Sequence, residues 1–194
     1  MDGVEVSTGT IPHGSLTLLG LTLDKSSFID VKRVFGAADI LPRAHDPHEP
    51  DIICYSISKA SKVYVSFAAG WPENPTEKLT SFSLASGNPR HDKNACASSH
   101  KVARKLTTDN GLRLGLTQSQ FTAIMGKPGK ITADWAVYSF ESHREYSKEE
   151  RIKKPRAPGG GEFKGEYTYY YVSAHFIGGK LDSLQVSVTG EPDW

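Results

Sequence analysis

Residues 45–51, with the sequence His-Asp-Pro-His-Glu-Pro-Asp, place two histidines among three carboxylates. Imidazole nitrogens and carboxylate oxygens are ligands that zinc and iron accept. His45, His48 and the more distant His91 therefore form one candidate centre for a small hydrolase or a metal-binding protein. The two prolines in the stretch are typical of a solvent-exposed turn, and the sequence favours this simpler interpretation, with no metal bound.

The chain carries none of the short motifs that mark common catalytic sites. It has no Gly-x-Ser-x-Gly elbow, no phosphate-binding loop, no dinucleotide fingerprint and no His-Glu-x-x-His motif. The histidines fall in different predicted elements and have no obvious serine or cysteine partner. We therefore expect no catalytic residues, no enzymatic activity and no cofactor.

A tyrosine-rich segment at residues 167–176 suggests binding rather than catalysis. Side chains alternate between the two sides of a strand, so polar and aromatic residues gather on one side and apolar residues on the other. Tyrosine and serine together make adaptable contact surfaces, although tyrosine is also common in strands for its packing alone. The candidate binding residues, which include a similar tyrosine from an earlier strand, are Tyr64, Tyr167, Tyr169, Tyr171 and His175.

Two short amphipathic helices, at residues 27–35 and 117–125, are predicted to help position this segment. Each begins with a hydroxyl residue and has Asp or Gln three positions later, which is the pattern of a capping box. Gly36 and Gly126 end the helices and lie 90 positions apart. A plan that recurs at a fixed separation predicts a duplicated structural unit.

Segments with strand-like alternation follow each helix. Val63, Val65 and Phe67 alternate with polar or aromatic residues, as in an antiparallel sheet with one buried face. Both helices are too short to be stable alone and must pack on such a sheet. The predicted fold class is therefore α+β, with two tandem repeats, each a short helical segment packed on an antiparallel sheet. The expected strands are Ile52–Ile57, Val63–Phe67, Leu79–Leu84, Trp135–Phe140, Tyr167–Ile177 and Leu181–Val188.

The repeat divides the chain into two lobes. The first is expected at residues 1–86 and the second at residues 111–194, with a polar linker at residues 87–110. Residues 141–166 interrupt the second lobe with a run of charges, prolines and glycines. That composition predicts a flexible insertion, which is either solvated chain or a loop that contacts a partner.

The repeated unit resembles a known one. Its best example is residues 111–128, where a Gly-Leu-Arg-Leu-Gly-Leu-Thr phrase leads into a capped helix that ends in Met-Gly-Lys-Pro, and residues 20–36 are a looser copy. This unit is similar to the repeat of the SmpA/OmlA outer-membrane lipoprotein family and of the beta-lactamase inhibitor proteins.

In the inhibitors, two such units stand in tandem, and their strands form a curved sheet whose concave face grips another protein. The resemblance therefore implies a bacterial, inhibitor-like binding protein. The inhibitors' contact loops have no residue-by-residue match here, so inhibition of their target enzyme is not carried over. The lipobox cysteine of the lipoproteins is also missing, so a lipoprotein role is not supported.

Composition excludes several other classes. Hydrophobic residues make up 38% of the chain, charged residues 23%, and the net charge is +1, which is ordinary for a globular protein. Such a balance gives no general attraction to nucleic acid. No apolar run reaches the roughly 18 residues that a membrane span requires. We expect a monomer with a protein partner, without nucleic acid and without a membrane span.

The two cysteines, Cys54 and Cys96, bear on the compartment. They are either two free thiols or one disulfide that joins the linker to the first lobe. Because their spacing does not suit a metal motif, we expect the disulfide, and with it an oxidising compartment. The N-terminus lacks the features of a signal peptide, so the chain is either cytoplasmic or an exported protein whose leader has been removed. Because of the expected disulfide, we expect the periplasmic or secreted mature form, with a cytoplasmic protein as the alternative.

These expectations combine into one hypothesis and one alternative. The hypothesis is a non-enzymatic exported binding protein that engages a protein partner through an open sheet face. The alternative is the small hydrolase or metal-binding protein that would use the histidine and acidic loops.

Overall fold

The computed structural model describes residues 7, 9–41, 50–58, 62–70, 77–87, 96–103, 105–153 and 162–193. It shows a mixed α+β fold made mostly of strands, which confirms the α+β part of the predicted class. The helices in this part of the chain are α1 (Phe28–Phe35), α2 (Gln118–Met125) and α3 (Lys148–Lys153). The strands are β1 (Thr17–Leu18), β2 (Leu21–Thr22), β3 (Asp51–Ser56), β4 (Val63–Ala69), β5 (Leu79–Ser86), β6 (Ala97–Ser98), β7 (Lys130–Ile131), β8 (Trp135–Glu145), β9 (Gly165–Ile177) and β10 (Lys180–Asp193).

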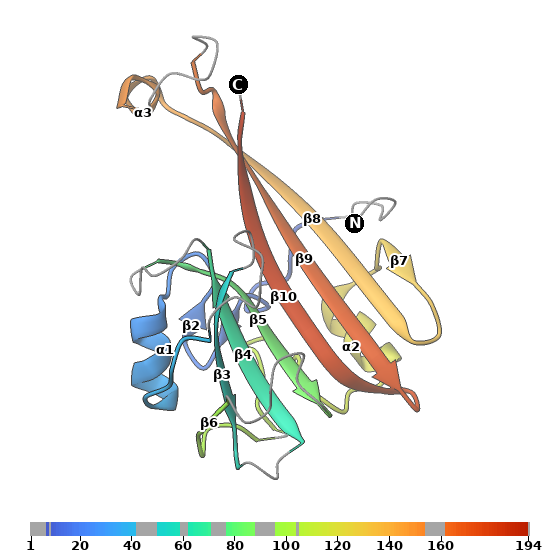
Figure 1. Ribbon diagram of the computed structural model, residues 1–194. Helices are drawn as coiled ribbons and strands as arrows, with labels where there is room; N and C mark the ends of the chain where they lie inside the picture. The colour runs from blue at the N-terminus through green and yellow to red at the C-terminus, as the bar shows by residue number, and fades with distance from the viewer. Residues whose placement is uncertain are drawn as a thin grey trace.

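Eight of these strands form one sheet in the order β6-β3-β4-β5-β10-β9-β8-β7. Every neighbouring pair runs antiparallel except β3 and β6, so the predicted antiparallel sheet is confirmed with one short parallel pair added. β5 and β10, which close the two predicted lobes, lie side by side at its centre (Figure 1). The sheet therefore runs without a break from one predicted lobe into the other.

Helices α1 and α2 pack on the same face of this sheet (Figure 1). Their buried side chains belong to one hydrophobic core together with the inward side chains of β3, β4, β5, β8, β9 and β10. Burial of this shared apolar surface is what stabilises two helices too short to form alone. The buried helix residues are Phe28, Val31, Phe35, Phe121 and Met125.

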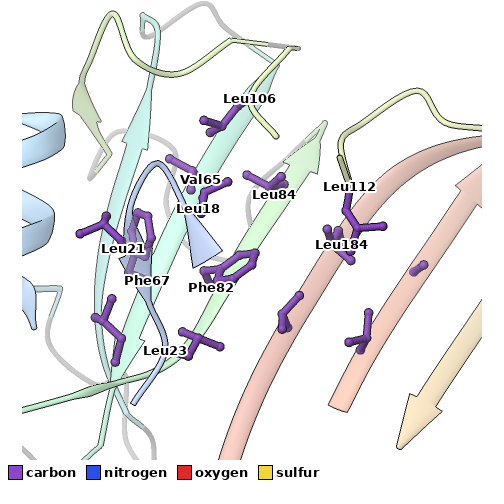
Figure 2. Packing of buried hydrophobic residues seen from close by; sticks show 14 of the residues in the cluster. Leu18, Leu21, Leu23, Val65, Phe67, Phe82, Leu84, Leu106, Leu112 and Leu184 are labelled. Carbon is purple, nitrogen blue, oxygen red and sulfur yellow. The ribbon is translucent and has the colours of Figure 1, made fainter. Parts of the chain in front are cut away.

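The hairpin of β1 and β2 covers part of the same core. Figure 2 shows Leu18, Leu21 and Leu23 directed toward the inner side of β4 and β5, where Phe67 and Phe82 lie. The two strands are joined by a two-residue turn in which both backbone φ angles are positive, 51° at Leu19 and 78° at Gly20. Such turns match the twist of the strands that they join.

Helices α1 and α2 both begin as the sequence predicted. At α1, the Ser27 amide and hydroxyl donate to Asp30 Oδ2 at 2.9 and 3.0 Å, and these bonds, the amide first, lower the pKa of the Asp30 carboxyl. At α2, the Thr117 amide donates to Gln120 Oε1 at 2.9 Å, and the Gln120 amide donates back to Thr117 Oγ1 at 3.2 Å. The predicted helix ends at Gly36 and Gly126 are also confirmed.

At the end of α1 and of α2, a buried tyrosine of the sheet forms a hydrogen bond with the helix's closing glycine. The Tyr55 hydroxyl of β3 donates to the Gly36 carbonyl at 2.8 Å, and the Tyr138 hydroxyl of β8 donates to the Gly126 carbonyl at 3.1 Å. Both residues are fully buried. Each bond satisfies a carbonyl that the helix end would otherwise leave without a partner.

These tyrosines predict a loss of stability in alkali. Burial raises the pKa of both Tyr55 and Tyr138 to about 12, from 10.0. Below about pH 10 both folded and unfolded states keep the phenols neutral, so their contribution is fully present. Between about pH 10 and pH 12 the unfolded state ionises first, and each tyrosine is expected to cost about 2–3 kcal/mol of stability.

Urea unfolding at about pH 9, 10 and 11 follows the first half of this loss. The matched control is the double variant Tyr55→Phe/Tyr138→Phe, which cannot ionise at either position. It should be less stable at neutral pH, because two hydrogen bonds are lost, yet its stability should fall less steeply with pH. An equal slope in the two proteins would show that these phenols do not control alkaline unfolding.

Cys54 and Cys96 are joined in a disulfide with their Cα atoms 4.6 Å apart, which confirms the predicted pair. The bond holds β6 beside β3, where Tyr55 pairs with Ala97. The segment predicted as a polar linker thus packs closely in its described part. Val102 and Leu106 are buried in the main core.

Strands β8, β9 and β10 extend well beyond the rest of the sheet. β10 pairs with β5 only from Ser183 to Ser187, and past this point the three strands continue together to α3 (Figure 1). We call this extension the arm; it consists of residues 141–145, 165–169 and 189–193.

The arm contains strand residues that the sequence assigned to the insertion at 141–166. Glu141–Glu145 continue β8, and Gly165 and Glu166 begin β9, so both predicted strands were too short. The reason is that residues 141–145 are all exposed. An apolar and polar alternation, which identifies a strand with one buried face, is therefore absent there.

The far end of the arm is held by hydrogen bonds to α3 and to β9. Ser147 and Glu150 cap α3 reciprocally, at 2.9 and 3.2 Å. Glu150 also pairs with Arg144 at 2.7 Å, which lowers the pKa of its carboxyl. The Tyr146 hydroxyl donates to Glu166 Oε2 at 3.1 Å.

Candidate binding face

Strands β8, β9 and β10 have a second side, which faces away from α1 and α2. In β9, Val172, Ala174 and Phe176 are buried in the core, whereas Tyr171 and His175 are partly exposed. This is the alternation predicted from the sequence. We call the second side the open face; it consists of the odd-numbered residues of β8 from 135 to 145, of β9 from 165 to 175 and of β10 from 183 to 193.

Four of the five candidate binding residues lie together on the open face. Tyr167, Tyr169, Tyr171 and His175 all belong to β9, and each is partly exposed. They form a continuous row because every second residue of a strand points the same way. The sheet thus presents these aromatic rings to solvent along one line.

Tyr64 is separated from this row. It lies on the same side of the sheet but on β4, where it pairs with Ala85 of β5. It is only 6% exposed and packs against the disulfide of Cys54 and Cys96. Its ring therefore supports the sheet edge and offers little surface for contact.

Two further aromatic residues join the row from β8. The Trp135 ring lies 4.4 Å from the His175 ring, and the His143 ring lies 4.4 Å from the Tyr167 ring. In the strand register, Trp135 stands directly opposite His175, and His143 stands directly opposite Tyr167. Neither residue was among the predicted binding residues, although Trp135 was identifiable from the alternation of its own strand. His143 was not, because it lies past the predicted strand end.

Gly165 of β9, which has no side chain, makes one contact between β8 and β10 possible. His143 Nε2 of β8 reaches Asp193 Oδ2 of β10 at 3.1 Å, passing over β9 at Gly165. A Cβ atom at residue 165 would lie only 2.8 Å from His143 Nε2 and 2.5 Å from the Arg144 carbonyl oxygen. Glycine at this position therefore lets the imidazole span three strands and stiffen the arm.

The open face of the arm is acidic. It carries four carboxylates: Glu141, Glu145, Glu191 and Asp193. Glu141 stands opposite Tyr169 in the register. The pKa of the Tyr169 phenol is raised, first by desolvation and then by the negative charges of Glu141 and Glu191. Glu141 and Glu191 thus lie close enough to the Tyr169 ring for their negative charge to affect it.

The candidate metal centre of His45, His48 and His91 lies outside the described residues. Within the described residues, no group of three or more His, Cys, Asp or Glu side chains is arranged to hold a metal ion. Likewise, no helix in the described ranges is long and apolar enough to cross a membrane. The disulfide suggests an oxidising environment.

Comparisons of the chain with protein-family models, curated proteins and solved structures give no match.

Proposed function

We propose that this protein is a non-enzymatic, exported binding protein that engages a protein partner through the open face. The observation that carries this proposal is the row of partly exposed aromatic rings on a rigid sheet. Aromatic residues are enriched at the centres of protein interfaces because they bury much area at little entropic cost. Helices α1 and α2 lie on the opposite side of the sheet and leave these rings accessible (Figure 1).

Export to the periplasm or the cell exterior is part of the proposal. A buried disulfide between Cys54 and Cys96 persists in an oxidising compartment and is rare in the cytosol. A protein stabilised by such a disulfide is expected to meet its partner outside the reducing cytosol.

Two tandem units are also part of the proposal. The caps at Ser27 and Thr117 and the tyrosine bonds to Gly36 and Gly126 support it, because each helix is held by the same devices. The strand order supports it further, since β3-β4-β5 and β8-β9-β10 meet antiparallel at β5 and β10. Together with the resemblance to the beta-lactamase inhibitor proteins, this arrangement favours an inhibitor-like role.

Capture of partners with matched variants tests the proposal. The immobilised protein is exposed to the exported fraction of the cells that make it, beside Tyr171→Ala and Ile29→Ala. Tyr171 lies on the open face, whereas Ile29 is an exposed residue of α1 on the opposite side. A partner of the open face should bind the Ile29 variant normally and the Tyr171 variant about 30-fold more weakly, the loss expected when a hot-spot side chain is truncated.

The same experiment contains its own contradiction. A captured protein that is lost from the Ile29 variant and kept by the Tyr171 variant would place the interface on the helix side and overturn the proposal. Circular dichroism of each variant shows whether it is folded, so a loss of binding is not confused with a loss of structure.

A further inference from the structure

The open face of the arm combines aromatic rings with negative charge, and this combination specifies a kind of partner. We infer that it binds a basic segment of a partner protein, with arginine or lysine side chains seated between the tyrosine rings and the carboxylates. The inference rests on the proposed function, because it names the chemistry of the partner that the open face would engage.

Negative charge surrounds the tyrosine rings of the arm. Glu141 and Glu191 lie on the two outer strands of the arm and flank the tyrosines of the middle strand. Among the odd-numbered residues of the three strands there is no lysine or arginine. The arginine of the arm, Arg144, is an even-numbered residue on the other side, where it pairs with Glu150 of α3. The face is therefore acidic although the whole chain has a net charge of +1.

The aromatic rings of the arm lie close to one another. Tyr167 and Tyr169 lie with their centroids 6.3 Å apart and their planes 19° apart, and the His143 ring lies 4.4 Å from Tyr167, tilted by 30°. Ring faces attract a cation, and an arginine guanidinium also stacks on them in parallel. Carboxylates beside the rings add charge-assisted hydrogen bonds to the same guanidinium. The raised pKa of Tyr169 has Glu141 and Glu191 among its causes, so both carboxylates are near enough to act at this point.

Charge also argues against two other occupants. A second copy docked through the same face would bring the carboxylates of both copies together, and like charges that meet in an interface disfavour binding. The phosphates of a nucleic acid would be repelled in the same way. An extended basic segment is the occupant whose charge complements this face.

Fluorescence anisotropy with simple peptides provides the test. The probes are fluorescein-labelled peptides of alternating arginine and serine, of lysine and serine, and of glutamate and serine, at about pH 7. The arginine peptide should bind saturably, the lysine peptide more weakly and the glutamate peptide not at all. Raising the salt from about 50 mM to about 300 mM should weaken the arginine peptide several-fold, because exposed charges are screened.

Charge-neutralising variants locate the binding. Glu141→Gln and Glu191→Gln should each weaken the arginine peptide by about 1.5-fold to fivefold, the range for an exposed charge pair. The matched control is Glu149→Gln, an equal change at an exposed residue of α3. It should leave the affinity unchanged, because α3 is joined through Glu150 to Arg144, which lies on the other side of the arm. Thermal melts of all three variants confirm that they are folded.

Several outcomes would overturn the inference. Equal binding of the arginine and glutamate peptides would do so, as would an equal loss in the Glu149 variant. A dimer that is insensitive to salt and broken by Tyr169→Ala would assign the face to a second copy instead.

The failure of this inference can be told from a failure of the proposed function. A captured partner that depends on Tyr171 but not on Glu141, Glu191 or salt would refute the basic segment and leave the binding role intact. A partner insensitive to both the tyrosine and the glutamate changes would refute both.

Discussion

Replacing Cys54 and Cys96 together by alanine is expected to lower the free energy of unfolding by about 4 kcal/mol. The disulfide closes a loop of 42 residues, and opening it releases the unfolded chain to a larger set of conformations. Alanine is preferred to serine because both sites are buried, where an unpaired hydroxyl would add its own cost. A loss of this size is a large fraction of the stability of a typical domain.

Urea unfolding of the wild type and the double variant measures the effect, with and without a reducing agent. Reduction should bring the wild type close to the double variant and leave the variant itself unchanged. This second comparison separates the loss of the crosslink from any packing defect caused by the substitutions. Two free thiols titrated in denatured, unreduced wild type would contradict the bond, and with it the exported compartment.

The second large effect is a difference in stability between two substitutions on opposite sides of β9, Phe176→Ala and Tyr171→Ala. Phe176→Ala should cost about 3–5 kcal/mol of stability, as for other buried aromatic residues. Phe176 is buried in the core and meets Phe121 of α2 edge to face, with ring centroids 5.9 Å apart. Tyr171→Ala should cost about 1 kcal/mol or less, because its ring lies on the open face and little packed volume is removed.

Urea unfolding of the two variants in parallel checks this difference. Both remove a large aromatic ring from β9, five residues apart, so strand propensity and side-chain size are nearly matched. Equal losses would mean that the open face is covered in solution, and would remove the basis for assigning it a binding role. A loss confined to Phe176→Ala leaves Tyr171 free to act in contact with a partner.

Local rules in the sequence determined a good part of this fold. The bounds of α1 and α2 follow from a hydroxyl residue, an Asp or Gln three positions on, and a closing glycine, because these groups satisfy the free amides and carbonyls of a helix end. The two sides of β9 follow from alternation alone. Both signals involve residues within a few positions of one another, so a single sequence contains them completely.

Contacts between distant residues were decided by the tertiary structure. The sequence did not indicate that β5 and β10 would pair at the centre of one sheet, because nothing local specifies which edges meet. The burial of Tyr64 depends on a disulfide closed from 42 residues away, and only its position in the sheet separates it from the exposed tyrosines.

The strands of the arm also could not be predicted in full from the sequence. Its strands have no buried side, so the alternation that identifies a strand is missing, and their pairing is seen only in the assembled sheet. The contact of His143 with Asp193 over Gly165 joins three strands. The acidic and aromatic surface therefore exists as a site only after folding, because its members come from segments that the sequence places up to 52 residues apart, from Glu141 to Asp193.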